Sequence, residues 1–370
     1  MMGHVHRAFS CLILSLFLLL PASCSQEQQT DFLKEPDKLL VWPPEPFKPR
    51  IQWIRQITSD DLIELKPGFW NRIGRFLFGT EKSAIIRSHG IYVNGDGILF
   101  IADPGARAIH VLDPVHRRYS MINSCGQTSF KSPIDFAMDE VNHLYVTDSA
   151  AGFVCRYKID NGELKIGKII ARMERPTGIS YNPRNGLIYV AKTTAHQIIA
   201  IDKDGKSHIT IGSSGAGPGK FNFPIALTVN HQGEVLVVDS LNARIQIFTP
   251  DGQFIRTFGQ PGDLSGFFAK PKGIAVDSED HIYVVDTLFD AVQLFDTNGQ
   301  LLMNFGSSGR NPGQFWLPSG IFIDRNDFIY VSDTYNQRIQ VFKYLKHSVP
   351  DAEDRLEKEQ TFRSRRREGR

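Results

Sequence analysis

Cysteine and net charge are both scarce in this chain of 370 residues. Its four cysteines include no pair separated by two residues, so neither a disulfide-built scaffold nor a zinc ribbon fits the sequence. A formal net charge of +2 provides no broad basic surface for a nucleic acid, and we expect no nucleic-acid partner. Hydrophobic residues at 41% and charged residues at 22% are ordinary for a globular protein. The core must therefore come from side-chain packing.

The N-terminus has the order of an export signal. Arg7 precedes an apolar run, Cys11 to Leu20, which is too short to cross a bilayer and ends at Pro21. Small residues and then Cys24 follow. This order resembles a bacterial lipoprotein signal over residues 1–23, and either cleavage route predicts a mature protein outside the cytoplasm.

The lipoprotein resemblance implies that Cys24 is lipidated and anchors the protein in a membrane. The alternative is secretion without a lipid after cleavage near Ser23. Ser25, in place of an aspartate after the cysteine, resembles lipoproteins sent to the periplasmic side of a Gram-negative outer membrane. We therefore expect a lipid-anchored protein of the cell envelope.

Two polar segments flank the central part of the chain. Residues 24–50 are polar and then rich in proline, which predicts an extended tether. Residues 345–370 mix acids with bases and end in several arginines, which predicts a disordered charged tail. The alternative for the tail is electrostatic docking to anionic lipid or polysaccharide.

The rest of the chain is one repeat written six times. Aspartates that end a strand-like run stand at Asp239, Asp286 and Asp333, at two intervals of 47 residues. Asp103 and Asp148 hold the same place in earlier copies, whereas the third copy has a lysine there. Each copy reads as four short strands rich in Ile, Val, Tyr and Phe, with apolar runs that are buried on both faces.

An all-β fold, a six-bladed β-propeller of four-stranded blades, satisfies this pattern over residues 51–344. The last copy has strands at 319–323, 328–332 and 338–343 but lacks a fourth. Residues 51–57 form an orphan strand before the first copy. We predict that this N-terminal strand pairs outside 338–343 and closes the ring.

The repeat resembles a known family. Its motifs are Pro-Lys-Gly-Ile-Ala-Val-Asp at 271–277 and Asn-Gln-Arg-Ile-Gln-Val-Phe at 336–342, and they resemble the NHL repeat. The resemblance covers about residues 85–344 and points to an exported bacterial, lipoprotein-like subgroup of NHL propellers. The function of that subgroup is mostly unassigned, so the resemblance implies a fold more than an activity.

The ring of strand-ending aspartates resembles a set of ligand-binding residues, but a structural role explains it as well. Each stands at a turn, where hydrogen bonds to the backbone or pairing with Arg244 or Arg338 would account for it. We therefore interpret these aspartates as structural.

Departures from the repeat are better functional candidates. At the Pro-x-Gly site of the expected channel mouth, the middle residue is His89 in the first copy and Lys272 in the fifth, and Asp135 replaces the glycine in the second. In the third copy Lys192 replaces the strand-ending aspartate, with His196 nearby. These residues would offer a base, a carboxylate and cations for catalysis or anion binding. The alternative is structural, with Lys192 paired to an aspartate of the neighbouring blade and His196 facing solvent.

The sequence bears on two further features, a calcium cofactor and a disulfide. Six-bladed lactonases, which this architecture resembles, hold calcium with Glu and Asn side chains. Here Asp135 is the only acid at the channel mouth, so calcium is weakly supported and we expect no cofactor. Cys125 and Cys155 belong to neighbouring copies and could form a disulfide in an exported compartment.

The leading hypothesis is a non-catalytic binding or scaffold module, a monomeric propeller that holds an envelope protein or polysaccharide on one face. The runner-up is a lactonase-like hydrolase or lyase at the channel mouth, with His89, Asp135 and Lys192 as candidate catalytic residues. No recognised catalytic motif is present in the sequence.

Overall fold

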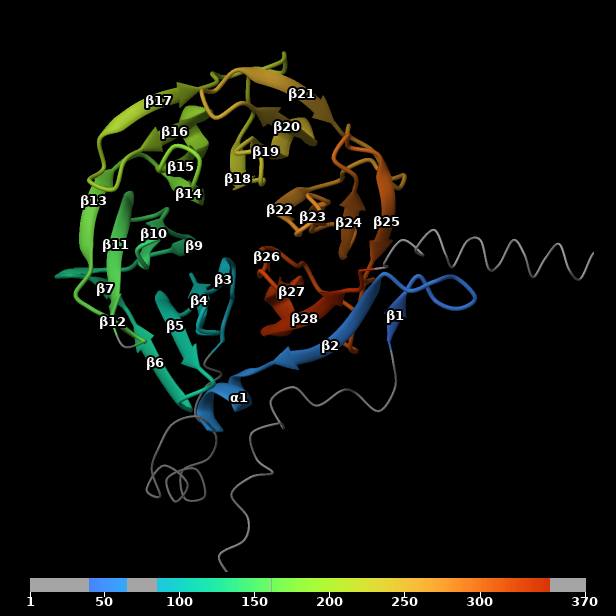
Figure 1. Cartoon of the computed structure of the whole chain (residues 1–370), viewed down its shortest axis with the longest axis horizontal. Helices are drawn as coiled ribbons and strands as arrows, with labels where there is room; N and C mark the ends of the chain where they lie inside the picture. The colour runs from blue at the N-terminus through green and yellow to red at the C-terminus, as the bar shows by residue number, and fades with distance from the viewer. Residues whose placement is uncertain (1–39, 65–84, 161, 347–370) are drawn as a thin grey trace, which may run out of the picture. The chain divides into compact units, whose positions relative to one another are not determined.

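Six antiparallel sheets form a ring in the computed structural model, which describes residues 40–64, 85–160 and 162–346 (Figure 1). The predicted all-β six-bladed propeller is therefore confirmed. The signal 1–23, Cys24, most of the expected tether and the tail from residue 347 lie outside the described residues. Among the described helices, none is long and apolar enough to cross a membrane.

The blades follow one another along the chain, and each places its first strand nearest the ring axis (Figure 1). Blades 1 and 2 comprise β3 (Ile91–Val93), β4 (Leu99–Asp103), β5 (Ala108–Asp113) and β6 (Arg118–Ile122), then β9 (Pro133–Met138), β10 (His143–Asp148), β11 (Phe153–Asp160) and β13 (Lys168–Arg172). A hairpin of β7 (Ser124–Cys125) and β8 (Thr128–Ser129) connects them, and β12 (Glu163–Leu164) pairs antiparallel with the end of β11.

Blades 3, 4 and 5 have the same order with little variation. They comprise β14 (Pro176–Asn182), β15 (Leu187–Lys192), β16 (Gln197–Ile201) and β17 (Ser207–Ile211); β18 (Pro224–Val229), β19 (Val235–Asp239), β20 (Arg244–Phe248) and β21 (Phe254–Phe258); β22 (Pro271–Val276), β23 (Ile282–Asp286), β24 (Ala291–Phe295) and β25 (Leu301–Phe305). Short 3-10 turns, η2 (Thr193–Ala195) and η3 (Ser240–Asn242), follow the second strands of blades 3 and 4.

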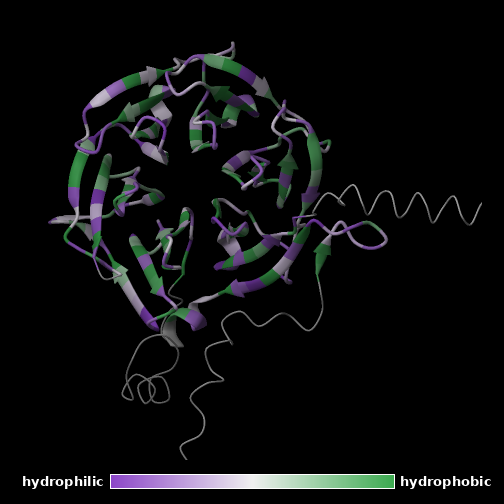
Figure 2. Cartoon of the chain, viewed as in Figure 1, coloured by the Kyte–Doolittle hydropathy of each residue, from purple (hydrophilic) through white to green (hydrophobic). Residues whose placement is uncertain are grey.

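Burial explains why these sequences form blades. The second strands β4, β19 and β23 are buried at every position, whereas the outer strand β6 is mostly exposed. Apolar side chains of one blade pack on those of the next, as Leu236 and Val238 of blade 4 do with Ile274 and Val284 of blade 5. Figure 2 accordingly shows hydrophobic residues along the strands and hydrophilic ones in many turns. Neighbouring blades thus share their cores.

Blade 6 is completed from the N-terminal side, as predicted. β26 (Ile321–Ile323), β27 (Phe328–Asp333) and β28 (Arg338–Tyr344), with η4 (Thr334–Asn336) between the last two, pair onward to β2 (Ile51–Ile57). The register runs from Ile51 opposite Tyr344 to Ile57 opposite Ile339. α1 (Ser59–Glu64) follows β2.

A fifth strand extends this blade. β1 (Val41–Trp42) pairs with β2 and lies within the stretch expected to be a tether. The cause is Trp42, whose ring packs against Phe305 and Phe342 with centroids 6.0 and 5.8 Å away. The proline-rich composition suggested an extended segment, but a single partly buried aromatic side chain is enough to dock it on the ring.

Candidate functional site at the top face

The face of the ring that carries the loops between second and third strands, together with the connectors between blades, is called the top face here. At this face the strand-ending aspartates hold the incoming connector through its backbone. Asp148 accepts hydrogen bonds from the N–H groups of Lys131 at 2.6 Å and Ser132 at 3.0 Å. Asp103, Asp239, Asp286 and Asp333 make bonds of the same kind. We call this arrangement the connector clamp.

The connector clamp accounts for these aspartates fully. Each is buried, and Asp239 and Asp333 also accept bonds from Arg244 and Arg338 at 2.8 and 2.7 Å. Buried carboxylates with this many donors are satisfied within the protein. Their structural interpretation from the sequence agrees with these contacts.

Two of the predicted site residues come together near the ring axis. Gly90, next to His89, donates its N–H to the carbonyl oxygen of Ile134 at 2.8 Å, which joins the inner edges of blades 1 and 2. Asp135 follows directly, and its carboxyl accepts from the N–H of Phe136 at 2.9 Å and from that of Ile179 in blade 3 at 3.3 Å. Asp135 thus bridges neighbouring blades.

Gly90 makes room for Asp135. A Cβ atom at Gly90 would lie 2.7 Å from the Cα and 2.8 Å from Oδ1 of Asp135. In blades 3, 5 and 6 glycine occupies the place of Asp135 itself, as Gly178, Gly273 and Gly320, and meets the neighbouring blade equally closely. The aspartate of blade 2 therefore fits only beside a residue without a side chain.

The ionisation of this group is strongly perturbed. Burial raises the pKa of Asp135 to about 7, against hydrogen bonds that lower it. Burial, together with the charge of Lys272, lowers the pKa of His89 to about 3, and Nδ1 of His89 is buried without a hydrogen-bond partner in the structure. Burial also lowers the pKa of Lys272. Although His89 and Asp135 remain partly accessible to solvent, their ionisable groups are surrounded by protein.

Lys272 is near enough for its charge to act on His89, whereas the remaining two of the five predicted residues lie elsewhere. Lys192 ends β15 and pairs with Pro176 in the sheet, one strand farther from the axis, and it forms no ion pair with a described residue. His196 is a connector contact, because its Nδ1 accepts the N–H of Phe223 at 3.2 Å and its ring meets that of Phe223. Asp290 serves the connector between blades 5 and 6 in the same way, through the N–H of Leu317.

A shallow depression of about 530 Å³ lies on the top face between blades 2 and 3. It is lined by the loop 149–152, by Glu174 and Arg175 of the connector, and by Thr194 of η2. His89, Asp135 and Lys192 are not among its lining residues. In the part of the chain that is described, no group of three His, Cys, Asp or Glu side chains forms a candidate metal site.

An apolar arc was missed by the sequence reasoning. Leu241, Leu288 and Tyr335 are 53%, 59% and 50% exposed, and each stands two residues after a strand-ending aspartate, in blades 4, 5 and 6. Trp316 lies 5.7 Å from the Tyr335 ring, and Arg310 lies 4.9 Å above Trp316. Aligning this one position across the copies would have found the arc.

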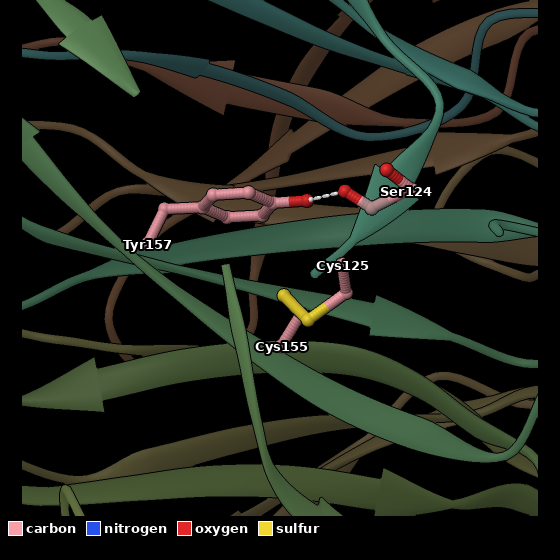
Figure 3. Close-up of a disulfide and its surroundings, with 4 residues drawn as sticks. All are labelled: Ser124, Cys125, Cys155 and Tyr157. Carbon is pink, nitrogen blue, oxygen red and sulfur yellow. Dashed lines mark hydrogen bonds between the residues drawn. A yellow bond between two sulfur atoms is a disulfide. The ribbon is translucent and has the colours of Figure 1, made fainter. Parts of the chain in front are cut away.

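Cys125 and Cys155 form a disulfide in the structure (Figure 3). It joins the β7–β8 hairpin to the third strand of blade 2. Beside it, the hydroxyl of Tyr157 donates to the carbonyl oxygen of Ser124 at 2.6 Å. Both half-cystines are buried, so the bond fixes the path of the connector between the first two blades.

Comparisons with known proteins agree with this architecture. A family model described as NHL repeat matches residues 315–342, and one described as 6-bladed beta-propeller matches residues 224–292. The chain is a six-bladed β-propeller, and its last blade matches the NHL repeat.

Among curated proteins, a gluconolactonase from Zymomonas mobilis is 30% identical over 120 residues, which cover 29% of this chain and 33% of that protein. The human E3 ubiquitin-protein ligase TRIM32 is 56% identical over 39 residues, which cover 10% of this chain and 6% of that protein. The matches thus span a third or less of these relatives.

Solved structures share the fold at low identity. A virginiamycin B lyase from Staphylococcus aureus has a TM-score of 0.53 at 18% identity and covers 70% of this chain and 95% of its own. An auxiliary nutrient binding protein from Bacteroides ovatus has a TM-score of 0.57 at 14% identity, with coverage of 72% and 71%. Catalytic and binding proteins both use this ring.

Proposed function

We propose that this protein is a non-catalytic binding module that holds an envelope protein on its top face. The observation that carries the proposal is the apolar arc. Exposed large apolar side chains gathered on one face are typical of interaction surfaces, and aromatic residues with arginine are enriched where partners bind.

Other blades of the same ring show whether the large side chains of the apolar arc are needed for folding. At the position of Leu241, Leu288 and Tyr335, blade 2 has Ala150 and blade 3 has Thr194. Blades with small or polar residues there form the same loops, so packing does not require the large side chains. A binding role gives a reason for them.

We propose that the protein acts outside the cytoplasm as a single propeller, tethered through a lipid on Cys24. The signal-like order of residues 1–23 supports export, and the disulfide between Cys125 and Cys155 suits an oxidising compartment. Replacement of Cys24 by alanine should release the protein from membranes while leaving the ring folded. Retention of the variant in the membrane fraction would remove the anchor from this proposal.

A site-specific photo-crosslinker tests the binding role. The probe replaces Leu288 in the apolar arc or, as the matched control, exposed Asn298 in a turn on the opposite face. We expect one discrete crosslinked protein from the native envelope with the probe at 288 and none at 298. Equal labelling at both positions, or none, would contradict the proposal, and a crosslinked polysaccharide would identify a glycan partner instead.

A second candidate is a hydrolase or lyase at the ring axis. The pair of a neutral buried histidine and a carboxyl whose pKa is near 7 favours it, because a general base works best near the operating pH. Turnover of an aldonolactone by the purified chain, lost in both Asp135→Asn and His89→Gln, would establish this function. Absence of turnover, or turnover unchanged in both variants, would exclude that site.

A further inference from the structure

Blade 3 departs from the connector clamp of its neighbours. In blade 2, Asp148 accepts the N–H groups of the two residues that precede the first strand, Lys131 and Ser132. Asp103 does this in blade 1 and Asp286 in blade 5, with distances between 2.6 and 3.0 Å. Both donors thus have a side-chain acceptor in the other five blades: one aspartate accepts both in blades 1, 2 and 5, and His196 or Asp290 accepts the second donor in blades 4 and 6.

In blade 3 the same two donors lack their acceptor. Glu174 and Arg175 precede Pro176 just as Lys131 and Ser132 precede Pro133, but the second strand ends in Lys192. Neither N–H group bonds to any described residue. In later blades, His196 and Asp290 at the end of the preceding loop accept a connector N–H. The corresponding residue before blade 3 is Gly152, which has no side chain to do so.

Further donors gather at the same place. Glu174, Arg175 and Thr194 line the depression on the top face, and Oγ1 of Thr194 is buried without a partner in the structure. Lys192, two residues before Thr194, forms no ion pair within the described ranges. Only Glu174 contributes an acidic side chain to the lining. The depression therefore presents hydrogen-bond donors at the place where the sister blades supply a carboxylate.

We infer that this depression binds the carboxylate of an aspartate side chain from a partner polypeptide, which completes the connector clamp of blade 3 from outside. A carboxylate can accept both backbone N–H groups at once, as in blades 1, 2 and 5, and charge-assisted bonds of this kind are strong. Oγ1 of Thr194 supplies an additional donor to the same anion. The site assigned is formed by Glu174, Arg175 and Thr194, and Lys192 stands at the position of the missing aspartate.

The chemistry favours a polypeptide over an acidic sugar. The same geometry already holds aspartate side chains in this fold, and Glu174 offers an acceptor for an N–H of a bound peptide. The apolar arc on the same face suits a protein surface. This inference rests on the proposed binding function and names the group that blade 3 recognises.

Titration of the isotope-labelled ring with a short peptide tests the site. The probe is acetyl-Gly-Asp-Gly-amide, and acetyl-Gly-Asn-Gly-amide is the neutral control of the same shape. We expect saturable amide shifts at Glu174 and Arg175 with the aspartate peptide and at least tenfold weaker binding of the asparagine peptide. Equal binding of the two peptides, or no shift up to the solubility limit, would overturn the inference. Shifts with galacturonate but not with the peptide would overturn the polypeptide source.

Lys192→Asp is the decisive variant, because it restores the residue of the other blades and supplies the carboxylate internally. We expect it to fold, to slow hydrogen exchange at the Glu174 and Arg175 amides, and to weaken peptide binding more than tenfold. Thr194→Val, which removes one donor at constant shape, should weaken binding severalfold. Lys270→Met removes a cation from the connector of blade 5 and should leave binding unchanged.

The two proposals fail separately. If Lys192→Asp binds the peptide as the parent chain does, the aspartate site is wrong even when the crosslink at position 288 is found. If the crosslink is absent while the peptide binds and Lys192→Asp abolishes that binding, the site stands and the apolar arc loses its role.

Discussion

The indole Nε1 of Trp53 donates a hydrogen bond to Oε1 of Gln340 at 3.0 Å, which joins side chains 287 positions apart in the sequence. The same Gln340 oxygen accepts the N–H of Gly313 at 2.8 Å. Strand β2 is therefore tied into blade 6 by side chains as well as by its backbone ladder.

Deletion of residues 40–57 should lower the melting temperature of the whole ring, since it exposes β28 and removes Ile51 from the core of blade 6. Calorimetry should still show one cooperative transition, shifted downward. The control is a chain that starts at residue 40, which keeps β1 and β2. An unchanged melting temperature after the deletion would contradict closure by β2.

Removal of the disulfide should destabilise the ring. The bond spans 30 residues, so Cys125→Ala with Cys155→Ala should cost about 3 to 4 kcal/mol on loop-entropy grounds. Urea unfolding of the oxidised parent and of the double variant measures the difference. Adding a reductant should lower the unfolding free energy of the parent toward that of the variant and leave the value for the variant unchanged. A difference under about 1 kcal/mol between the oxidised parent and the variant would contradict this expectation.

Gly90→Ala should be much more harmful than Gly95→Ala. A Cβ at Gly90 would meet backbone atoms of Ile134 and Asp135, whereas one at Gly95 meets nothing within 4 Å. We expect a loss of about 2 to 3 kcal/mol at position 90, because the clash involves backbone of the next blade. Chemical denaturation of both variants gives the comparison, and similar losses would disprove the close approach.

His89 and Asp135 should give opposite pH dependences of stability. The folded protein keeps His89 neutral down to about pH 3, while the unfolded chain takes up the proton below about 6.5, so stability is lost as pH falls through this window. The folded protein keeps Asp135 protonated up to about pH 7, while the unfolded chain ionises above about 4, so stability is lost as pH rises.

These two effects oppose each other between about pH 4 and 6.5, with each at most about 1.4 kcal/mol per pH unit. Asp135→Asn should therefore become more stable relative to the parent as pH rises, and His89→Gln less stable. Melting temperatures of the three proteins between pH 4 and 7.5 measure the slopes. Parallel curves would mean that neither group is shifted.

The ring and its closure could be predicted because they depend on features that repeat. The segment Ile51 to Ile57 had the pattern of a strand that belonged to no repeat copy, and the last copy lacked its fourth strand. β1 escaped prediction, since two residues carry no periodicity and their docking depends on Trp42 meeting aromatic rings from distant positions.

The site was only partly predictable. His89 and Asp135 were found because they break the repeat at the inner strands, which the fold brings together. His196 breaks the repeat too, yet its ring nitrogen replaces an aspartate oxygen in the same contact, and the sequence cannot distinguish exchange of a structural acceptor from a new function. The importance of the missing aspartate at position 192 became visible only beside the N–H groups of Glu174 and Arg175, which bond to no described residue.

The pairing of β2 with β28 also sets the order of events in folding. β2 precedes the other ring strands along the chain, and its partner β28 is the last strand of blade 6. The strand made early therefore has no partner until almost all of the ring has been synthesised. Contacts of such long sequence separation form late and slow folding. We therefore expect the sheet of blade 6 to be the last one completed during folding.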